Sequence, residues 1–191
     1  MSLDNLGELG RLLESCLLHG LTTFKENNTS IRIDQQPDET ILFFCIDNHS
    51  KGHEKCRGCH LRDKLWGDQE GYSICDLVVF YEHRRTGRRV LCFVELKDNA
   101  KDLHHAAQQV ISTYESIKQS IDFSSHRYAV KAFLIAHHGT APHEHIHDQK
   151  LLKGCFGTDN YLYHAKKDRF QDFLRGNTVI SVQKRKERRN H

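Results

Sequence analysis

The chain has 191 residues and a formal net charge of +3, so it is not a globally basic protein, and any surface for nucleic acid must be local. No apolar run approaches the length that crosses a bilayer, and the first residues lack the basic segment of a secretory signal. We therefore expect a cytoplasmic protein with no membrane partner. Seven cysteines in such a chain favour reduced thiols or metal ligands over a disulfide framework.

The N-terminal third predicts one helix and one hairpin. Leucines recur at helical intervals between residues 3 and 18, which predicts an amphipathic helix ending before Gly20, with Glu14 on the flank of its apolar stripe. The apolar runs Ile31–Ile33 and Ile41–Ile46 surround a Gln-Gln-Pro-Asp-Glu turn, so they predict the first hairpin of a sheet.

Residues 47–74 form a cysteine- and histidine-rich insertion with little core-forming periodicity, so the segment needs another source of order. Cys56 and Cys59 form a C-x-x-C knuckle, and Cys45 and Cys75 flank it. Four thiolates can hold a structural zinc ion, with one position taken alternatively by a histidine. An iron–sulfur cluster, a redox dithiol and plain buried cysteines are the other interpretations. The alternative histidine ligands are His49, His53 and His60.

A second hairpin follows. Leu77–Tyr81 and Val90–Leu96 are rich in β-branched and aromatic residues, and the polar turn 83–88 separates them. If the hairpin is symmetric about this turn, Glu82 lies opposite Arg89 and Asp76 lies opposite Glu95. A register shifted by two residues also keeps Asp76, Glu95 and Lys97 on one face, whereas a shift by one residue does not. Opposed carboxylates repel each other, so a divalent cation and the neighbouring Lys97 would have to offset the repulsion.

The remaining elements predict a crossover into a mixed sheet. Asp98-Asn99 precede a helical stripe that runs from Leu103 to Ile121, with Gln109 at its edge. Tyr128–Ala136 is an apolar run broken only by Lys131, as in a strand buried on both faces. A short helix near 168–174, an edge strand at 179–182 and a basic tail at 183–191 complete the prediction. We expect one domain over residues 1–180.

These motifs resemble the core of the PD-(D/E)xK nuclease superfamily. The resemblance rests on Asp76, the strand-turn-strand, Glu95-Leu96-Lys97, and a helix with Ala106 and Gln109, and it covers roughly residues 3–137. More narrowly, the CD, VELK and AxxQ motifs resemble those of small bacterial members of the superfamily. Cys75 stands where the superfamily often has proline, and Tyr114 comes one residue later than the usual Q-x-x-x-Y spacing.

The resemblance implies an α/β fold with a restriction-endonuclease-like αβββαβ core, whose mixed central sheet is flanked by helices. It also implies a nuclease that hydrolyses phosphodiester bonds, with DNA as the expected substrate, in bacterial defence or DNA repair. Mg²⁺ or Mn²⁺ would be held by oxygen ligands, and Lys97 would orient water or stabilise the transition state. The implied metal ligands are Asp76, Glu95 and the Leu96 carbonyl, with Glu14 and Gln109 as further site residues.

Two alternatives stay open at this point. One is a catalytically inactive, zinc-stabilised module that binds nucleic acid or a protein partner through the same fold. The other is a redox protein that works through Cys56 and Cys59. Histidines 137, 138, 143, 145 and 147 suggest either a metal site or a lining for the substrate groove, and a homodimer is compatible with the sequence.

Overall fold

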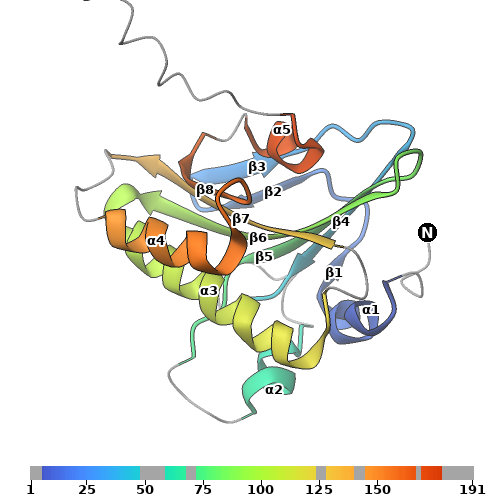
Figure 1. The fold of residues 1–191 in the computed structure, drawn as a ribbon, viewed down its shortest axis with the longest axis horizontal. Helices are drawn as coiled ribbons and strands as arrows, with labels where there is room; N and C mark the ends of the chain where they lie inside the picture. The colour runs from blue at the N-terminus through green and yellow to red at the C-terminus, as the bar shows by residue number, and fades with distance from the viewer. Residues whose placement is uncertain are drawn as a thin grey trace, which may run out of the picture.

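A computed structural model describes residues 6–47, 59–67, 72–123, 128–139, 145–166 and 169–177 (Figure 1). Its centre is a six-stranded mixed sheet in the order β1-β4-β5-β6-β7-β8. Neighbours are antiparallel from β1 to β6, and β6, β7 and β8 are parallel. The strands are β1 (Leu17–Leu18), β4 (Glu39–Cys45), β5 (Leu77–His83), β6 (Arg88–Asn99), β7 (Tyr128–His138) and β8 (Tyr161–Ala165).

The predicted second hairpin is confirmed as β5 and β6. Glu82 lies opposite Arg89 and Leu77 lies opposite Val94, which is the symmetric register expected from the sequence. Gly87 has φ +66° in the connecting turn, a conformation that glycine adopts without steric cost. The alternation of faces allows this register or one shifted by two residues, and the structure has the symmetric one.

The crossover is also confirmed. Helix α3 (Leu103–Ser120) follows β6, and β7 pairs with β6 in parallel. The apolar stripe of α3 is buried against one face of the sheet, with Phe93 and Phe80 in the same core cluster. A 3-10 turn, Ala100–Asp102, separates β6 from α3, so the N-cap of the helix is Asp102 rather than Asp98 or Asn99.

The opposite face of the sheet is covered by a separate two-stranded sheet and by α5 (Phe170–Arg175) (Figure 1). The small sheet pairs β2 (Thr23–Glu26) with β3 (Thr29–Arg32). The expected hairpin of Ile31–Ile33 with Ile41–Ile46 is therefore wrong. Ile31 and Ile33 are fully buried in the same core cluster as Phe43, because the small sheet packs its apolar side on the face of the large sheet.

The N-terminal helix is shorter than predicted. Helix α1 spans Glu8–Leu13, a 3-10 turn covers Glu14–Cys16, and β1 begins at Leu17. Leu17 and Leu18 leave the helical pattern because they pair with Phe44 and Phe43 at the edge of the sheet. Helices α2 (Leu61–Trp66) and α4 (His145–Phe156), like β2 and β8, were not anticipated; the short helix predicted near 168–174 is confirmed as α5.

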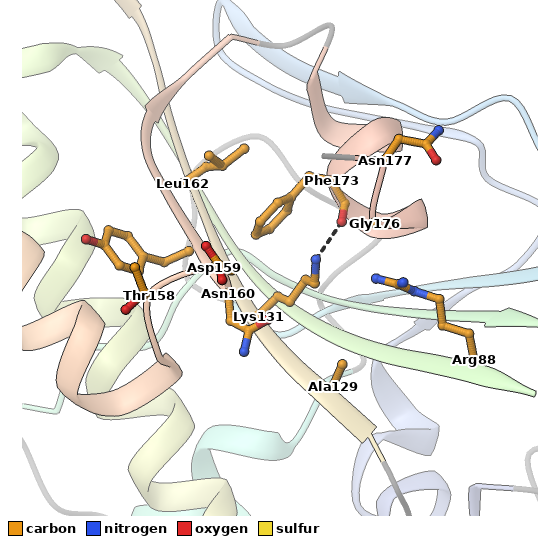
Figure 2. A pocket seen from close by; sticks show the side chains of 11 residues that line it. Arg88, Ala129, Lys131, Thr158, Asp159, Asn160, Leu162, Phe173, Gly176 and Asn177 are labelled. Atoms are coloured by element: carbon orange, nitrogen blue, oxygen red, sulfur yellow. Dashed lines mark hydrogen bonds between the residues drawn. The ribbon is translucent and has the colours of Figure 1, made fainter. Parts of the chain in front are cut away.

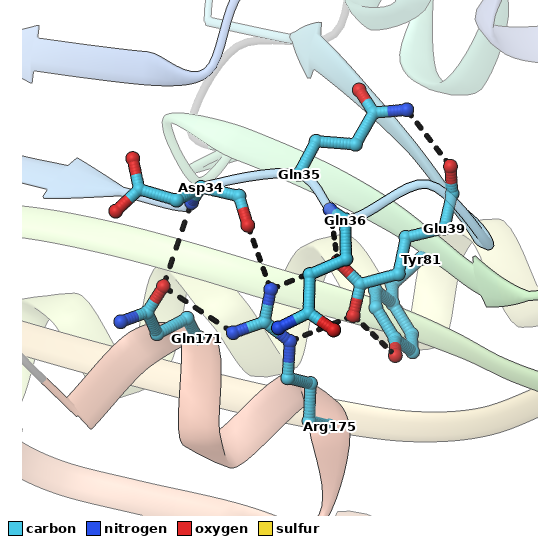
Figure 3. Close-up of polar contacts among 7 residues, drawn as sticks. All are labelled: Asp34, Gln35, Gln36, Glu39, Tyr81, Gln171 and Arg175. Carbon is cyan, nitrogen blue, oxygen red and sulfur yellow. Dashed lines mark hydrogen bonds and ion pairs between the residues drawn. The ribbon is translucent and has the colours of Figure 1, made fainter.

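A buried ion pair fastens α5 to the sheet (Figure 3). Arg175 donates to both carboxylate oxygens of Glu39, at 2.7 and 2.8 Å, and to the carbonyl oxygen of Asp34 at 2.7 Å. The Tyr81 hydroxyl donates to the same carboxylate at 3.0 Å. These charge-assisted hydrogen bonds lower the pKa of Glu39 to about 2, with Arg175 as the main cause.

The predicted edge strand at 179–182, the basic tail at 183–191 and most of the insertion at 47–74 lie outside the described residues. Within the described residues, every helix is too short or too polar to cross a bilayer.

Candidate active site

The candidate site lies at the open end of the β5–β6 hairpin. Continuing the register one residue beyond Leu77 and Val94 sets Asp76 opposite Glu95. The N–H of Asp76 donates to Oε2 of Glu95 at 2.9 Å, and the N–H of Leu96 donates to Oδ2 of Asp76 at 2.7 Å. Each carboxylate is thus held by the main chain of the other strand. The side chains are buried, with 4% of Asp76 and 0% of Glu95 exposed.

Lys97 completes the predicted trio. Its ammonium group forms an ion pair with Oε1 of Glu95. Burial disfavours the charge on Lys97, but the Glu95 carboxylate outweighs burial, so the pKa of Lys97 is raised. The structure therefore brings Asp76, Glu95 and Lys97 together, with the lysine in its charged form.

A third carboxylate, Glu26, comes from the β2–β3 hairpin and was missed from the sequence. Glu26 lies close to Asp76. It raises the pKa of Asp76 by charge repulsion and by a side-chain hydrogen bond. Oε2 of Glu26 is buried and has no hydrogen-bond partner in the described part of the chain. The sequence did hold a signal, because two alternating strands flank the dipeptide Asn27-Asn28, a typical hairpin turn.

This turn is docked directly onto the end of β6. Asn27 adopts φ +49°, which asparagine tolerates better than most residues and which closes the two-residue loop. The Asn28 N–H donates to Oδ1 of Asp98 at 3.2 Å, and the buried Thr29 hydroxyl donates to the Lys97 carbonyl oxygen at 2.8 Å. These contacts hold Glu26, the last residue of β2, beside the hairpin that carries the other carboxylates.

The electrostatics of the site favour the binding of a cation. Burial is the main cause that raises the pKa of Asp76 well above its usual range, and Glu95 and Glu26 raise it further. Burial also raises the pKa of Glu95 to about 7, although Lys97 opposes the shift. The raised pKa values mean that the crowded carboxyl groups hold protons near neutral pH, and a divalent cation bound by their oxygen atoms would displace these protons.

Two of the remaining predicted site residues occupy supporting positions. The Gln109 amide donates to the Ile74 carbonyl oxygen at 2.9 Å, so it fixes the chain two residues before Asp76. Nearby, the Thr113 hydroxyl accepts a hydrogen bond of 2.9 Å from the Cys75 N–H. Glu14 is exposed on the 3-10 turn Glu14–Cys16, and the structure gives the third acidic position to Glu26 instead.

The cysteines do not form the predicted set. Cys59 is disulfide-bonded to Cys16, so the expectation of reduced thiols is wrong for this cysteine. Its partner, Cys16, was not among the expected zinc ligands. Cys45 is also disulfide-bonded, and it packs in the core cluster on the opposite face of the sheet from Cys59. Cys75 is free, its Sγ lies 3.5 Å from the Leu77 carbonyl oxygen, and burial raises the pKa of its thiol.

Zinc in this segment stays a prediction, because Cys56, His49 and His53 lie outside the described residues. His60 is described, and its exposed ring lies 3.5 Å from the Asp63 carboxylate. Over the described ranges, no group of three or more His, Cys, Asp and Glu side chains is already arranged to hold a metal ion. The residues at Asp76 nevertheless suit a hard cation, because they are oxygen donors and because Oε2 of Glu26 is buried without a hydrogen-bond partner among the residues that the structure describes.

Two histidines of the second predicted cluster, His145 and His137, lie in different surroundings, and His143 lies outside the described residues. His145 contacts the Tyr163 hydroxyl at 2.5 Å, and that hydroxyl donates to Asp148 at 3.0 Å. His104 from α3 contacts the other oxygen of Asp148 at 2.7 Å, so this network ties α4 to α3 and β8. His137 instead lines a pocket beside the candidate site.

That pocket has a volume of about 440 Å³ and lies between the β2–β3 turn and the carboxyl ends of β7 and β8. Its polar wall includes Asn28, His137, His164 and Lys166. His164 has φ +53°, and β8 shifts register between its pairings with Phe133 and Ile135. Such bulges re-aim side chains next to active sites, and here the bulge carries a pocket residue.

A scan of protein-family models, a search of curated proteins and a search of solved structures each found no match for this chain.

Proposed function

We propose that the protein is a metal-dependent nuclease that hydrolyses phosphodiester bonds, with DNA as the substrate class. The observation that carries the proposal is the convergence of Asp76, Glu95 and Lys97 at the end of one hairpin. The order α1, β4, β5, β6, α3, β7, with an antiparallel meander before the crossover, agrees with a restriction-endonuclease-like core.

The carboxylates of Asp76, Glu95 and Glu26 would hold one or two Mg²⁺ or Mn²⁺ ions. Such an ion, when bound, supplies activation of the attacking water and stabilises negative charge on the phosphate. Lys97 stays charged beside Glu95 and stabilises the same charge as the transition state forms. Gln109 positions the chain that leads into Asp76.

The pocket beside the site suits the substrate backbone. Lys166 provides a fixed positive charge, and His137 and His164 provide hydrogen-bond donors and acceptors. Phosphate contacts of this kind position a nucleic acid without reading its sequence. The pocket adjoins the catalytic group, because Thr29 lines it and also donates to the Lys97 carbonyl oxygen.

The test is cleavage of labelled single-stranded and double-stranded DNA and RNA, with and without Mn²⁺. Asp76→Asn, Glu95→Gln and Lys97→Met should each lower metal-dependent cleavage by at least about a hundredfold. Lys101→Met, at an exposed position just beyond β6, is the control and should cleave normally. Thermal unfolding would establish that each variant is folded.

A folded triple variant that cleaved like the wild type would refute the proposal. If the wild type cleaved none of these substrates, and calorimetry found no Mn²⁺ site dependent on Asp76 and Glu95, the inactive binding module would be the better description.

A further inference from the structure

A second pocket lies at the other end of the sheet, at the amino-terminal ends of β6, β7 and β8 (Figure 2). Arg88 begins β6 and Lys97 lies nine residues further along the same strand, which corresponds to about 30 Å. The pocket is therefore separate from the candidate active site. It holds Lys131, the one residue that interrupts the apolar run of β7.

Lys131 is an unusual residue for this position, because only 5% of it is exposed. Its ammonium group donates to the Phe173 carbonyl oxygen at 2.7 Å and lies 4.2 Å from the centre of the Phe173 ring. Among the described residues, no carboxylate lies within ion-pair distance of it. The Asp159 carboxylate lines the same pocket and raises the pKa of Lys131 from beyond ion-pair distance, which only partly offsets its burial. An ammonium group has three donors, so burial with one hydrogen bond and no direct ion pair among the described residues is costly.

Arg88 directs a second positive charge into the same space. Figure 2 shows its guanidinium group and the Lys131 ammonium converging below the turn that contains Gly176. Nε of Arg88 is buried and has no hydrogen-bond partner within the described ranges. Burial lowers the pKa of Lys131, and the charge of Arg88 lowers it further. Both groups would gain from a bound anion.

Gly176 leaves the room that Arg88 needs. A Cβ atom at this position would lie 2.3 Å from both terminal nitrogens of Arg88. Gly176 also has φ +73° at the C-cap of α5, where a side chain would be strained. The end of α5 is therefore compatible with a guanidinium group inside the pocket.

The rest of the wall indicates what kind of anion fits. The cavity has a volume of about 320 Å³, which is larger than a bare phosphate requires. Leu162 and Phe173 provide an apolar surface, and Asp159 and Asn160 provide acceptors for hydroxyl groups. A phosphate would face the two cations, while a sugar and a base would contact the acceptors and the apolar wall.

We propose that this pocket binds the phosphate group of a small organic phosphate of nucleoside monophosphate size, through Arg88 and Lys131. The proposal is independent of the nuclease function, because it uses none of the residues at Asp76. On this proposal, the role of Lys131 in the buried strand β7 is to bind the phosphate group and not to stabilise the fold.

Calorimetric titration of the full chain in EDTA with AMP, inorganic phosphate and adenosine tests the proposal. AMP should bind saturably, and adenosine should bind at least about tenfold more weakly, because it lacks the charged group. Titration with inorganic phosphate shows whether the pocket binds the free anion or an organic phosphate. Lys131→Met and Arg88→Gln should each weaken binding of AMP at least about tenfold, whereas Lys150→Met, at an exposed position of α4, should not.

A second measurement separates binding from a structural role. Lys131→Met should unfold at the same temperature as the wild type or higher, because it removes a buried charge and keeps the apolar stem. A lower unfolding temperature would assign Lys131 to the support of α5 and contradict the proposal. Absence of saturable AMP binding, equal binding of adenosine, or unchanged AMP binding in both pocket variants would also overturn it.

Discussion

The main-chain N–H of Asp76 donates a hydrogen bond of 2.9 Å to Oε2 of Glu95, which joins the two acidic residues across the open end of the β5–β6 hairpin. In the reverse direction, the N–H of Leu96, the residue after Glu95, donates to the Asp76 carboxylate at 2.7 Å. This reciprocal arrangement fixes both carboxylates without a bound cation. It also places them where their charges repel each other, which contributes to the raised pKa of Asp76.

Deprotonation of Glu95 should make the metal-free protein less stable as the pH rises. Its pKa is raised from 4.5 to about 7, so the associated stability is complete below pH 4.5 and is lost as the pH rises through 7. Urea unfolding in EDTA should therefore give a lower free energy of unfolding at pH 8 than at pH 5. Glu95→Gln should reduce this difference, and an equal pH dependence in the variant would contradict the assignment.

Glu26→Gln should weaken Mn²⁺ binding at least about tenfold, because it removes one of the three proposed carboxylate ligands. Isothermal titration calorimetry measures the affinity directly, without reference to cleavage. The matched control is Glu14→Gln, at an exposed position that the sequence suggested for the same role. If Glu14→Gln weakened binding and Glu26→Gln did not, the third ligand would be the one first suggested by the sequence.

Thr29→Val should destabilise the protein by about 1 kcal/mol, because it removes the donor to the buried Lys97 carbonyl oxygen and keeps the shape of the side chain. Thr23→Val, at an exposed position of the same small sheet, should change the free energy of unfolding by less than about 0.5 kcal/mol. Equal effects of the two substitutions in urea unfolding would show that the hydrogen bond does not anchor the hairpin.

Arg175→Met should cost about 3–5 kcal/mol, because it leaves the Glu39 carboxylate buried without its cation (Figure 3). The double variant Glu39→Gln/Arg175→Met should recover part of this loss. As a control, Arg32→Met breaks an ion pair whose side chains are 71% and 64% exposed, and should cost less than about 1 kcal/mol. A similar loss for both single variants would argue against a special role for the buried pair.

The same ion pair predicts sensitivity to acid. The pKa of Glu39 is lowered from 4.5 to about 2, so its contribution is present above pH 4.5 and is lost as the pH falls through 2. The full difference corresponds to about 3 kcal/mol. Glu39→Gln should show a shallower loss of stability than the wild type between pH 5 and pH 2.5. A parallel pH profile in the two proteins would place the acid sensitivity elsewhere.

The sequence by itself determined the part of the fold that is local. The β5–β6 hairpin followed from alternating faces around a short turn, which allowed the observed register or one shifted by two residues. The helix and the parallel strand after it followed from their own periodicities. For this reason Asp76, Glu95 and Lys97 could be placed together from the chain alone, within about twenty residues of each other.

Tertiary structure decided which distant segments join this hairpin. Glu26 reaches Asp76 because the β2–β3 hairpin packs on the face of the large sheet and docks its turn on Lys97 and Asp98, contacts that span about seventy residues. The pairing of Cys16 with Cys59, and the meeting of Arg88 with Lys131, have the same origin. The periodicity of apolar residues indicates only which side of a helix or strand is buried. The packing of the whole core determines which other elements that side contacts.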